Sequence, residues 1–429
     1  MHPHSVGLLT ASPPAAFPVG SLIRPFRPLG ARERYHGILS FQEWEKTWSF
    51  CKSAGKWKTE HKSVKKTFPQ IFASTPNGTV VAMSYHVVAT NVELWVIDGR
   101  ITFTPHDHTD PLFGGFATAG LVDAHAHTTF DLSDRDLTPG ADETVSENVL
   151  DYLGAGVTYL RDTGGISMAA VAQQGPRLAA AGRFLAPPGR YIPDWILPTE
   201  PSDLAAAATK QVAAGSWWVK IVCDWFSPET GKVESHYDRD VVASAVDAAH
   251  AAGARVAMHC IDEESVDIAL ATGVDSIEHA CNATKSQVEL MAERGTAWCP
   301  TITAVRGFTS HPLSDPEYQS RVRSFYAETL YELLPLASTL GVTILAGSDT
   351  VPPAEFWREV VALHEYGLSP EGALAAATTE ARGYFGVPDL EEGAPADLVL
   401  YDGDPRVDPA ALASPALVMV GGRILSRRR

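Results

Sequence analysis

Eight apolar, strand-like segments alternate with helix-like segments between residues 119 and 385 of this 429-residue chain. The strand-like segments are Gly120–Ala124, Val157–Arg161, Arg183–Ala186, Trp217–Val222, Arg255–His259, Val274–His279, Ala297–Thr303 and Val342–Ala346. A repeating strand–helix order is typical of α/β folds with parallel strands. Eight such units in about 265 residues predict a (β/α)8 TIM barrel, whose usual size is about 250 residues, with a doubly wound sheet as the alternative.

The helix-like segments carry the residues that start and stop helices. Acidic residues open the segments that we expect at 239–252 and 262–272, and Gly253, Gly273 and Gly295 follow the expected ends at 252, 272 and 294. Glycine is favoured there because the residue after a helix often takes a left-handed conformation. Asp315-Pro316 opens a further helix that should end before Gly341.

Short β-rich runs lie on both sides of this repeat. They occupy residues 85–104 on one side and 397–401 and 417–425 on the other. We predict that residues 83–118 and 386–429 together form a small β-sandwich domain, in which the C-terminal strands pair with those of 85–104. Residues 119–385 would then form the barrel.

The first 82 residues differ in charge from the rest of the chain. They hold 11 Lys+Arg and 4 Asp+Glu, whereas the remaining residues hold 23 and 47. They also lack sustained hydrophobic periodicity. We therefore expect residues 1–82 to be a basic extension that is disordered or not part of the native protein, with Met83 as the functional initiator.

Composition limits the class of partner and the compartment. The formal net charge of -17 argues against nucleic acid or an anionic membrane surface, and no apolar run reaches the roughly 18 residues of a membrane span. Five cysteines without paired spacing predict reduced thiols and a cytoplasmic protein. We expect a small-molecule substrate, no nucleic acid and no membrane. The sequence is also compatible with a homo-oligomer.

The predicted strands place residues of metal-ligand type at one end of the barrel. His125 and His127 are spaced i, i+2, so their side chains should point to the same side of the first strand. The other candidates at or just beyond strand ends are Lys220, His259, His279 and Asp349. Each alone is more typical of a structural residue. Together they favour a site, because function in such barrels lies at the C-terminal ends of the strands.

Several sequence motifs occur in the order of a known superfamily. They are GLVDAHAH at 120–127, GVTYLRDTGG at 156–165, GPRLAAAGR at 175–183, VKI at 219–221, VDSIEHA at 274–280, AGSDT at 346–350 and APADLVL at 394–400. The chain resembles the metal-dependent amidohydrolase superfamily over residues 84–427. It is most similar to the imidazolonepropionase-like branch, which includes dipeptidases and prolidases with a carboxylated lysine.

This resemblance implies a metal-dependent hydrolase with a binuclear zinc site. His125, His127 and Asp349 would hold one zinc ion, His259 and His279 the other, and carboxylated Lys220 would bridge both. An ammonium group has no lone pair, whereas a carbamate offers two anionic oxygens. A metal-bridging hydroxide would attack a C–N bond of an amide, dipeptide or cyclic amide, with Asp349 as the catalytic proton shuttle.

Residues outside the metal set are candidates for substrate binding. Tyr237 lies in the loop after the fourth strand, about where related dipeptidases place a substrate-binding tyrosine, and packing at a helix start is its alternative role. Arg190 and Tyr191 follow the third strand, and Arg190 could pair with a substrate carboxylate. Aromatic residues in 224–226 and 351–357 depart from the resemblance and leave the substrate open.

Three other functions are compatible with the same residues. A mononuclear imidazolonepropionase or heterocycle aminohydrolase would not need Lys220. A phosphotriesterase or lactonase would use the same metal site. A metal-stabilised binding protein without turnover is the alternative from another class, and Asp349 with the open loops argues against it.

Overall fold

A computed structural model describes residues 84–130, 142–175, 177–192, 195–227, 229–308 and 316–428. The predictions for residues 1–82 and for Met83 as initiator lie outside the described residues. The described part is an α/β protein with parallel sheets.

Two parallel sheets hold the strands of the repeat. Strands β6 (Leu121–Ala126), β7 (Val157–Asp162) and β8 (Leu178–Ala180) form a three-stranded sheet. The second sheet has the order β10 (Ile196–Pro198), β9 (Phe184–Ala186), β11 (Trp218–Val222), β14 (Arg255–Cys260), β15 (Ser276–His279) and β16 (Ala297–Cys299). Every residue of β6, β7 and β11 is buried, as expected for parallel strands covered on both faces.

Isolated bridges join the two sheets. Gly165 pairs with Arg183, next to β9, and residues 342–349 pair with both sheets through Trp298–Ile344 and Ala126–Asp349. The predicted strand 342–346 is thus present as single bridges. The predicted strand 297–303 ends early, at Cys299, because helix α8 begins at Ile302.

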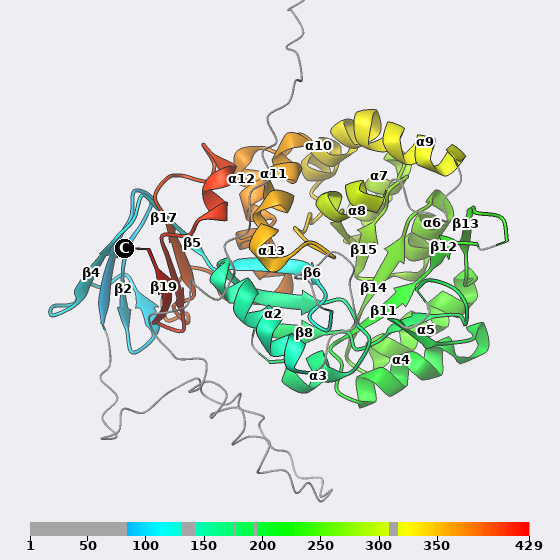
Figure 1. Cartoon of the computed structure of the whole chain (residues 1–429), viewed down its shortest axis with the longest axis horizontal. Coiled ribbons are helices and arrows are strands. Elements are labelled where there is room, and N and C mark those ends of the chain that lie inside the picture. The colour runs from blue at the N-terminus through cyan, green and yellow to red at the C-terminus, as the bar shows by residue number, and fades with distance from the viewer. Residues whose placement is uncertain are drawn as a thin grey trace, which may run out of the picture. The chain divides into compact units, whose positions relative to one another are not determined.

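Helices cover the outer side of these strands, as Figure 1 shows for α4 and α5 beside β11 and β14. Their bounds are α2 (Asp142–Gly154), α3 (Ala169–Gln173), α4 (Leu204–Ala213), α5 (Arg239–Ala251), α6 (Glu263–Thr272), α7 (Lys285–Arg294), α8 (Ile302–Phe308), α9 (Pro316–Ser324), α10 (Leu330–Leu340), α11 (Trp357–Glu365), α12 (Pro370–Ala375) and α13 (Thr379–Phe385). The predicted glycine stops are confirmed, with φ of 77° at Gly273, 69° at Gly295 and 80° at Gly341. A capping box formed by Thr284 and Gln287 starts α7.

Strands from both ends of the repeat share a separate core. One sheet has the order β3 (Arg100–Thr102), β2 (Glu93–Ile97), β1 (Tyr85–Val88), β4 (Asp110–Phe113), and the other β19 (Arg423–Arg427), β18 (Leu417–Val420), β17 (Leu398–Tyr401), β5 (Phe116–Ala119). Side chains of both sheets, including Val87, Leu94, Leu398 and Met419, pack into one cluster. The pairing differs from the prediction: β17 pairs with β5, not with a strand of 85–104.

The remaining features are local. A short hairpin of β12 (Asp224–Phe226) and β13 (Val233–Ser235) follows β11 and was not predicted. In the described part of the chain four cysteines are buried and free, at positions 223, 260, 281 and 299. No helix there is long and apolar enough to cross a membrane.

Candidate metal centre

The six predicted ligands come together from the middle of β11, the ends of β6, β14 and β15, and the segment after residue 346. All are buried, with 1% exposure for Lys220 and 9% for Asp349. The ring centres of His125 and His127 are 5.1 Å apart, as are those of His125 and His279, and those of His259 and His279 are 4.6 Å apart. Ligand atoms of His125, His279 and Asp349 all lie within 4.8 Å of one another.

Backbone contacts hold the segment of Asp349 against β6. The Asp349 amide donates to the His125 carbonyl at 2.6 Å, and the Ala124 amide donates to the Ala346 carbonyl at 2.8 Å. Gly347 allows this approach, because a Cβ there would lie 2.5 Å from both His125 Cβ and Cys299 Sγ. Asp349 and His279 have φ of 54° and 71°, a conformation that costs non-glycine residues energy and that often marks functional sites.

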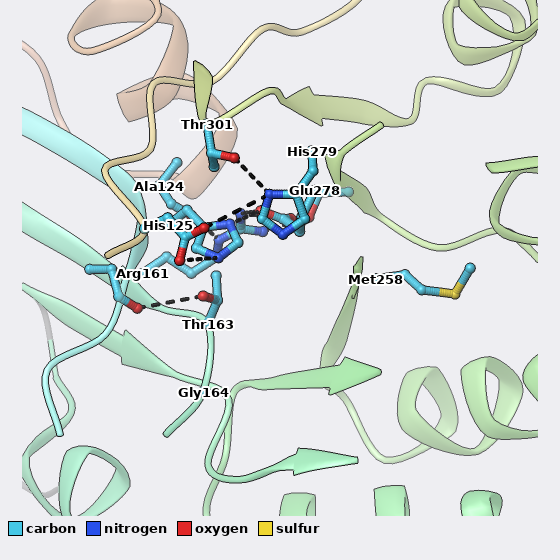
Figure 2. A network of polar contacts seen from close by, with 12 residues as sticks. Ala124, His125, Arg161, Thr163, Gly164, Met258, Glu278, His279 and Thr301 are labelled. Atoms are coloured by element: carbon cyan, nitrogen blue, oxygen red, sulfur yellow. Dashed lines mark hydrogen bonds and ion pairs between the residues drawn. The ribbon is translucent and has the colours of Figure 1, made fainter. Parts of the chain in front are cut away.

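Three of the four histidines have their Nδ1 atom occupied. Nδ1 of His125 lies 2.6 Å from Glu278 Oε2, that of His127 donates to the Gly164 carbonyl at 2.7 Å, and that of His279 lies 2.6 Å from Thr301 Oγ1. Figure 2 shows His125, Glu278 and His279 lying together, with Thr301 joined to His279. Such partners fix the ring orientation of metal-binding histidines and leave Nε2 for the metal.

The carboxylate of Asp349 faces the Nε2 atoms of His125 and His127. Its Oδ1 atom is 3.0 Å from His127 Nε2 and 3.9 Å from His125 Nε2. Burial by itself raises the Asp349 pKa, but His125 and His127 lower it to about 2, so the group is a carboxylate at neutral pH. Burial lowers the His127 pKa, yet its bond to Asp349 raises it above the ordinary value overall.

Lys220 lies among these ligands without a hydrogen-bond partner in the described residues. Its Nζ atom is buried, and burial lowers the pKa of the amine to about 8. An isolated buried ammonium is costly, whereas a neutral amine can react with carbon dioxide to form a carbamate. Four histidines, one carboxylate and this amine are donors suited to zinc, so the residues present fit a metal centre.

A buried ion pair between Arg161 and Glu278 supports the ring of His125. Nη2 of Arg161 donates to both oxygens of Glu278 at 2.8 Å, and its Nε donates to the Ala124 carbonyl. Sequence reasoning missed Arg161 and Glu278 as functional positions. The signals were present, because Arg161 lies in the strand-end motif at 156–165 and Glu278 directly precedes His279.

Asp123 is a second support that sequence reasoning missed. Its carboxylate accepts hydrogen bonds from the amides of His125 and Ser348, each at 3.0 Å, and from the Ser348 hydroxyl. Burial raises its pKa to about 7. The i, i+2 spacing of Asp123 and His125 on one strand was the signal that could have revealed it.

The predicted substrate-binding residues have different locations. Tyr191 lies beside the candidate metal site: its ring centre is 5.5 Å from that of His259 and 4.7 Å from that of Trp225. Arg190 is partly exposed, and its Nη1 atom lies 3.4 Å from Oε2 of Glu229. Tyr237 is buried and its hydroxyl donates to the Thr199 carbonyl at 2.9 Å. This is the packing position at the start of α5, so substrate binding by Tyr237 stays a prediction.

Aromatic rings lie beside two of the predicted metal-ligand histidines. Trp225 lies 5.5 Å from His259 between ring centres, and Phe184 and Phe130 lie 5.4 and 5.9 Å from His127. The expected aromatic group after β11 is therefore present beside the centre. These rings limit the water near the ligands and strengthen electrostatic interactions there.

Residues 116–425 match the model of the amidohydrolase family. The chain belongs to this family. An uncharacterized protein of Mycobacterium tuberculosis is 35% identical over 347 residues, which cover 78% of this chain and 92% of that protein. The imidazolonepropionase of Micrococcus luteus is 25% identical over 268 residues, covering 52% of this chain and 63% of that enzyme.

A solved structure shares the amidohydrolase fold. The crystal structure of a Xaa-Pro dipeptidase with bound methionine in the active site has a TM-score of 0.67 and 22% identity, and the match covers 80% of this chain and 99% of that one. The predicted amidohydrolase superfamily is thereby confirmed. Family membership makes the chain a hydrolase, and the buried ligands of the centre are candidates for metal binding.

Proposed function

We propose that this protein is a zinc-dependent hydrolase that cleaves the C–N bond of an amide, a dipeptide or a cyclic amide. The observation that carries the proposal is the buried Lys220 amine, which lacks a partner among the described residues and lies among four histidines and Asp349. Carboxylation would turn this unpartnered amine into a carbamate, whose two anionic oxygens would hold two metal ions. The resemblance of the fold to that of the Xaa-Pro dipeptidase supports an amide substrate.

The architecture that would present this site is a closed (β/α)8 barrel. The bridges Trp298–Ile344, Ala126–Asp349 and Gly165–Arg183 support closure because they join the ends of the two parallel sheets. The shared core of the two four-stranded sheets likewise supports a β-sandwich domain. We propose that residues 83–118 and 386–429 form that domain and that residues 119–385 form the barrel.

The residues divide the work of such a reaction. His125, His127 and Asp349 would hold one zinc ion, His259 and His279 the second, and Lys220 both. When bound, zinc polarises a scissile carbonyl and lowers the pKa of water. The ionised Asp349 can accept the proton of the attacking water and deliver it to the leaving amine. Tyr191, whose ring lies beside that of His259, would contact the substrate, and the partly exposed Arg190 would pair with a charged group of the substrate.

A mononuclear imidazolonepropionase-like or aminohydrolase activity is the second candidate. It is favoured by the match to the Micrococcus luteus enzyme. Such an enzyme has no use for a carboxylated lysine, so the environment of Lys220 argues for the binuclear site. A phosphotriesterase or lactonase activity would rest on the same ligands.

Metal analysis followed by a substrate screen tests the proposal. The purified protein should contain two zinc ions per chain and should hydrolyse members of a panel of dipeptides, N-acyl amino acids and hydantoins. One zinc ion per chain with turnover of a heterocycle would support the second candidate. Asp349→Asn should retain most of the zinc and lose turnover. Near-wild-type hydrolysis by that variant would contradict the assigned proton transfer.

A further inference from the structure

Six aromatic rings follow one another beside the candidate metal centre. The centres of neighbouring rings in this series are between 4.2 and 6.4 Å apart. The series begins 5.9 Å from the ring centre of His127 and passes that of His259 at 5.5 Å. We call these rings the aromatic wall, and in spatial order they belong to Phe130, Trp195, Tyr191, Trp225, Phe226 and Tyr318.

The aromatic wall is assembled from distant parts of the sequence. Its members come from the segments after β6 and β9, from β12 and from α9. The side chains that hold the rings of His125 and His279 are instead polar, namely Glu278 and Thr301. The aromatic wall therefore provides an apolar contact surface beside His127 and His259.

Tyr191 joins the two halves of the aromatic wall. Its ring centre lies 6.4 Å from that of Trp195 and 4.7 Å from that of Trp225. It also lies 5.5 Å from the ring centre of His259. Tyr191 is half-buried, whereas the other five members are buried. Tyr191 is therefore the part of the wall that keeps accessible surface for a bound molecule.

The backbone at Tyr191 is strained. Its φ is 63°, a left-handed conformation that is uncommon for bulky residues and that costs free energy. A turn precedes it, in which the amide of Arg190 donates to the carbonyl of Pro187 at 3.1 Å. Another turn follows, in which the amide of Trp195 donates to the carbonyl of Ile192 at 3.1 Å. Strain of this kind often occurs where a side chain contacts a ligand.

The geometry of the rings indicates what this surface can bind. The ring planes of Tyr191 and Trp225 are inclined by 70°, as are those of Tyr191 and His259. In such an arrangement the positive edge of one ring faces the negative face of the next, so a further aromatic ring can extend the series. A saturated ring of the same size has no such quadrupole and gains only apolar contact.

We propose that the substrate carries an aromatic ring close to the cleaved amide and that this ring packs against Tyr191 and Trp225. This rests on the proposed function, because the amide has to lie at the metal centre for the ring to reach the wall. The proposal narrows the substrate class to aromatic members, such as N-aroyl amino acids, dipeptides with an aromatic side chain and aryl-substituted hydantoins.

Matched substrate pairs test the inference on the zinc-loaded wild-type protein. N-benzoylglycine and N-cyclohexanecarbonylglycine place the ring on the acyl side of the amide. N-acetylphenylalanine and N-acetylcyclohexylalanine place it on the amine side. We expect kcat/KM to be about 3- to 10-fold higher for the aromatic member of at least one pair, mainly through a lower KM, which is the usual effect of one aromatic pair.

Substitutions of Tyr191 assign this preference to the aromatic wall. Tyr191→Leu should bring the ratio of kcat/KM in the preferred pair close to one, because it removes the ring, whereas Tyr191→Phe should keep the ratio. Phe113→Leu is the control and should also keep the ratio, since Phe113 lies in β4 and is 72% exposed. Zinc content and melting temperature of each variant distinguish loss of the ring from misfolding.

Binding to the metal-free wild type gives a second measurement that needs no variant. In a saturation-transfer NMR titration, benzamide should bind about 3- to 10-fold more tightly than cyclohexanecarboxamide. Equal binding of the two amides, equal cleavage within both substrate pairs, or a preference that survives in Tyr191→Leu would overturn the inference alone. A zinc-loaded wild type that hydrolyses no amide would instead overturn the proposed function.

Discussion

Nδ1 of His125 and Oε2 of Glu278 lie 2.6 Å apart, although 153 positions separate the two residues in the sequence. The same carboxylate receives both bonds from Arg161. Burial raises the Glu278 pKa, but Arg161 and Lys220 lower it below the ordinary value overall. Glu278 therefore stays ionised and couples a buried ion pair to the orientation of a predicted metal-ligand histidine.

Glu278→Gln should lower both stability and metal affinity. The substitution leaves the charge of Arg161 buried without its counter-ion, which typically costs about 3 kcal/mol or more. An amide nitrogen facing His125 also no longer fixes which ring nitrogen of His125 carries the proton. We therefore expect zinc affinity to fall about 10-fold. Urea unfolding of the metal-free protein and zinc titration measure the two effects. Glu263→Gln, at an exposed position of α6, is the control, and equal behaviour of the two variants would contradict the prediction.

The sequence was sufficient to predict that the candidate ligands lie together, but not which residues support them. His125, Lys220, His259 and His279 could be found because parallel strands present their C-terminal ends at one edge. Glu278 should lie on the opposite face from His279 if the strand stays regular. The φ of 71° at His279 ends the extended conformation, and a two-residue alternation cannot anticipate this change.

The pairing of the β domain was not predictable for a related reason. All residues of Phe116–Ala119 are buried, so the segment lacks the alternation that marks a strand with one exposed face. The sequence analysis therefore predicts no strand at these residues, and the actual partner of β17 is missing from the prediction. The helix ends were predictable because Gly273, Gly295 and Gly341 provide a local signal that does not depend on tertiary contacts.

Lys220→Met should weaken zinc binding and stabilise the metal-free protein. Burial lowers the folded-state pKa of the amine from 10.5 to about 8, which corresponds to about 3 kcal/mol of destabilisation below pH 8. That cost is relieved as pH rises from 8 to 10.5, because the folded protein loses the proton before the unfolded chain does. Denaturant unfolding of both proteins in carbonate-free buffer should show the largest gain for Lys220→Met below pH 8. Equal stability at pH 7 would contradict the burial argument.

Gly347→Ala should disrupt the centre without altering a ligand. The added Cβ would lie 2.5 Å from both His125 Cβ and Cys299 Sγ, so the segment carrying Asp349 has to move away from β6. We expect about a 10-fold or greater loss of zinc affinity, since ligand geometry is sensitive to small displacements. Gly383→Ala is the control because a Cβ added there would meet no described atom within 4 Å. Zinc titration of both variants is the measurement, and unchanged affinity in Gly347→Ala would show that the strand end can adjust.

Glu359→Gln should remove a pH dependence of stability that arises outside the set of predicted metal ligands. Glu359 lies in α11 and accepts the amides of Ile302 and Thr303 at 2.8 Å each, at the first turn of α8. Burial raises its pKa from 4.5 to about 7, although these two bonds oppose the shift. The folded protein therefore holds this proton more tightly than the unfolded chain between those two values.

The contribution of Glu359 is fully present below pH 4.5 and is lost as pH rises through 7. Its size is about 3 kcal/mol from the shift in pKa. The stability difference between the wild-type and Glu359→Gln proteins should fall by about that amount between pH 5 and pH 8, measured by urea unfolding of the metal-free proteins. Glu371→Gln, at an exposed position of α12, should show no such change. A constant difference for Glu359→Gln would mean that Glu359 stays ionised throughout, with its two amide bonds outweighing its burial.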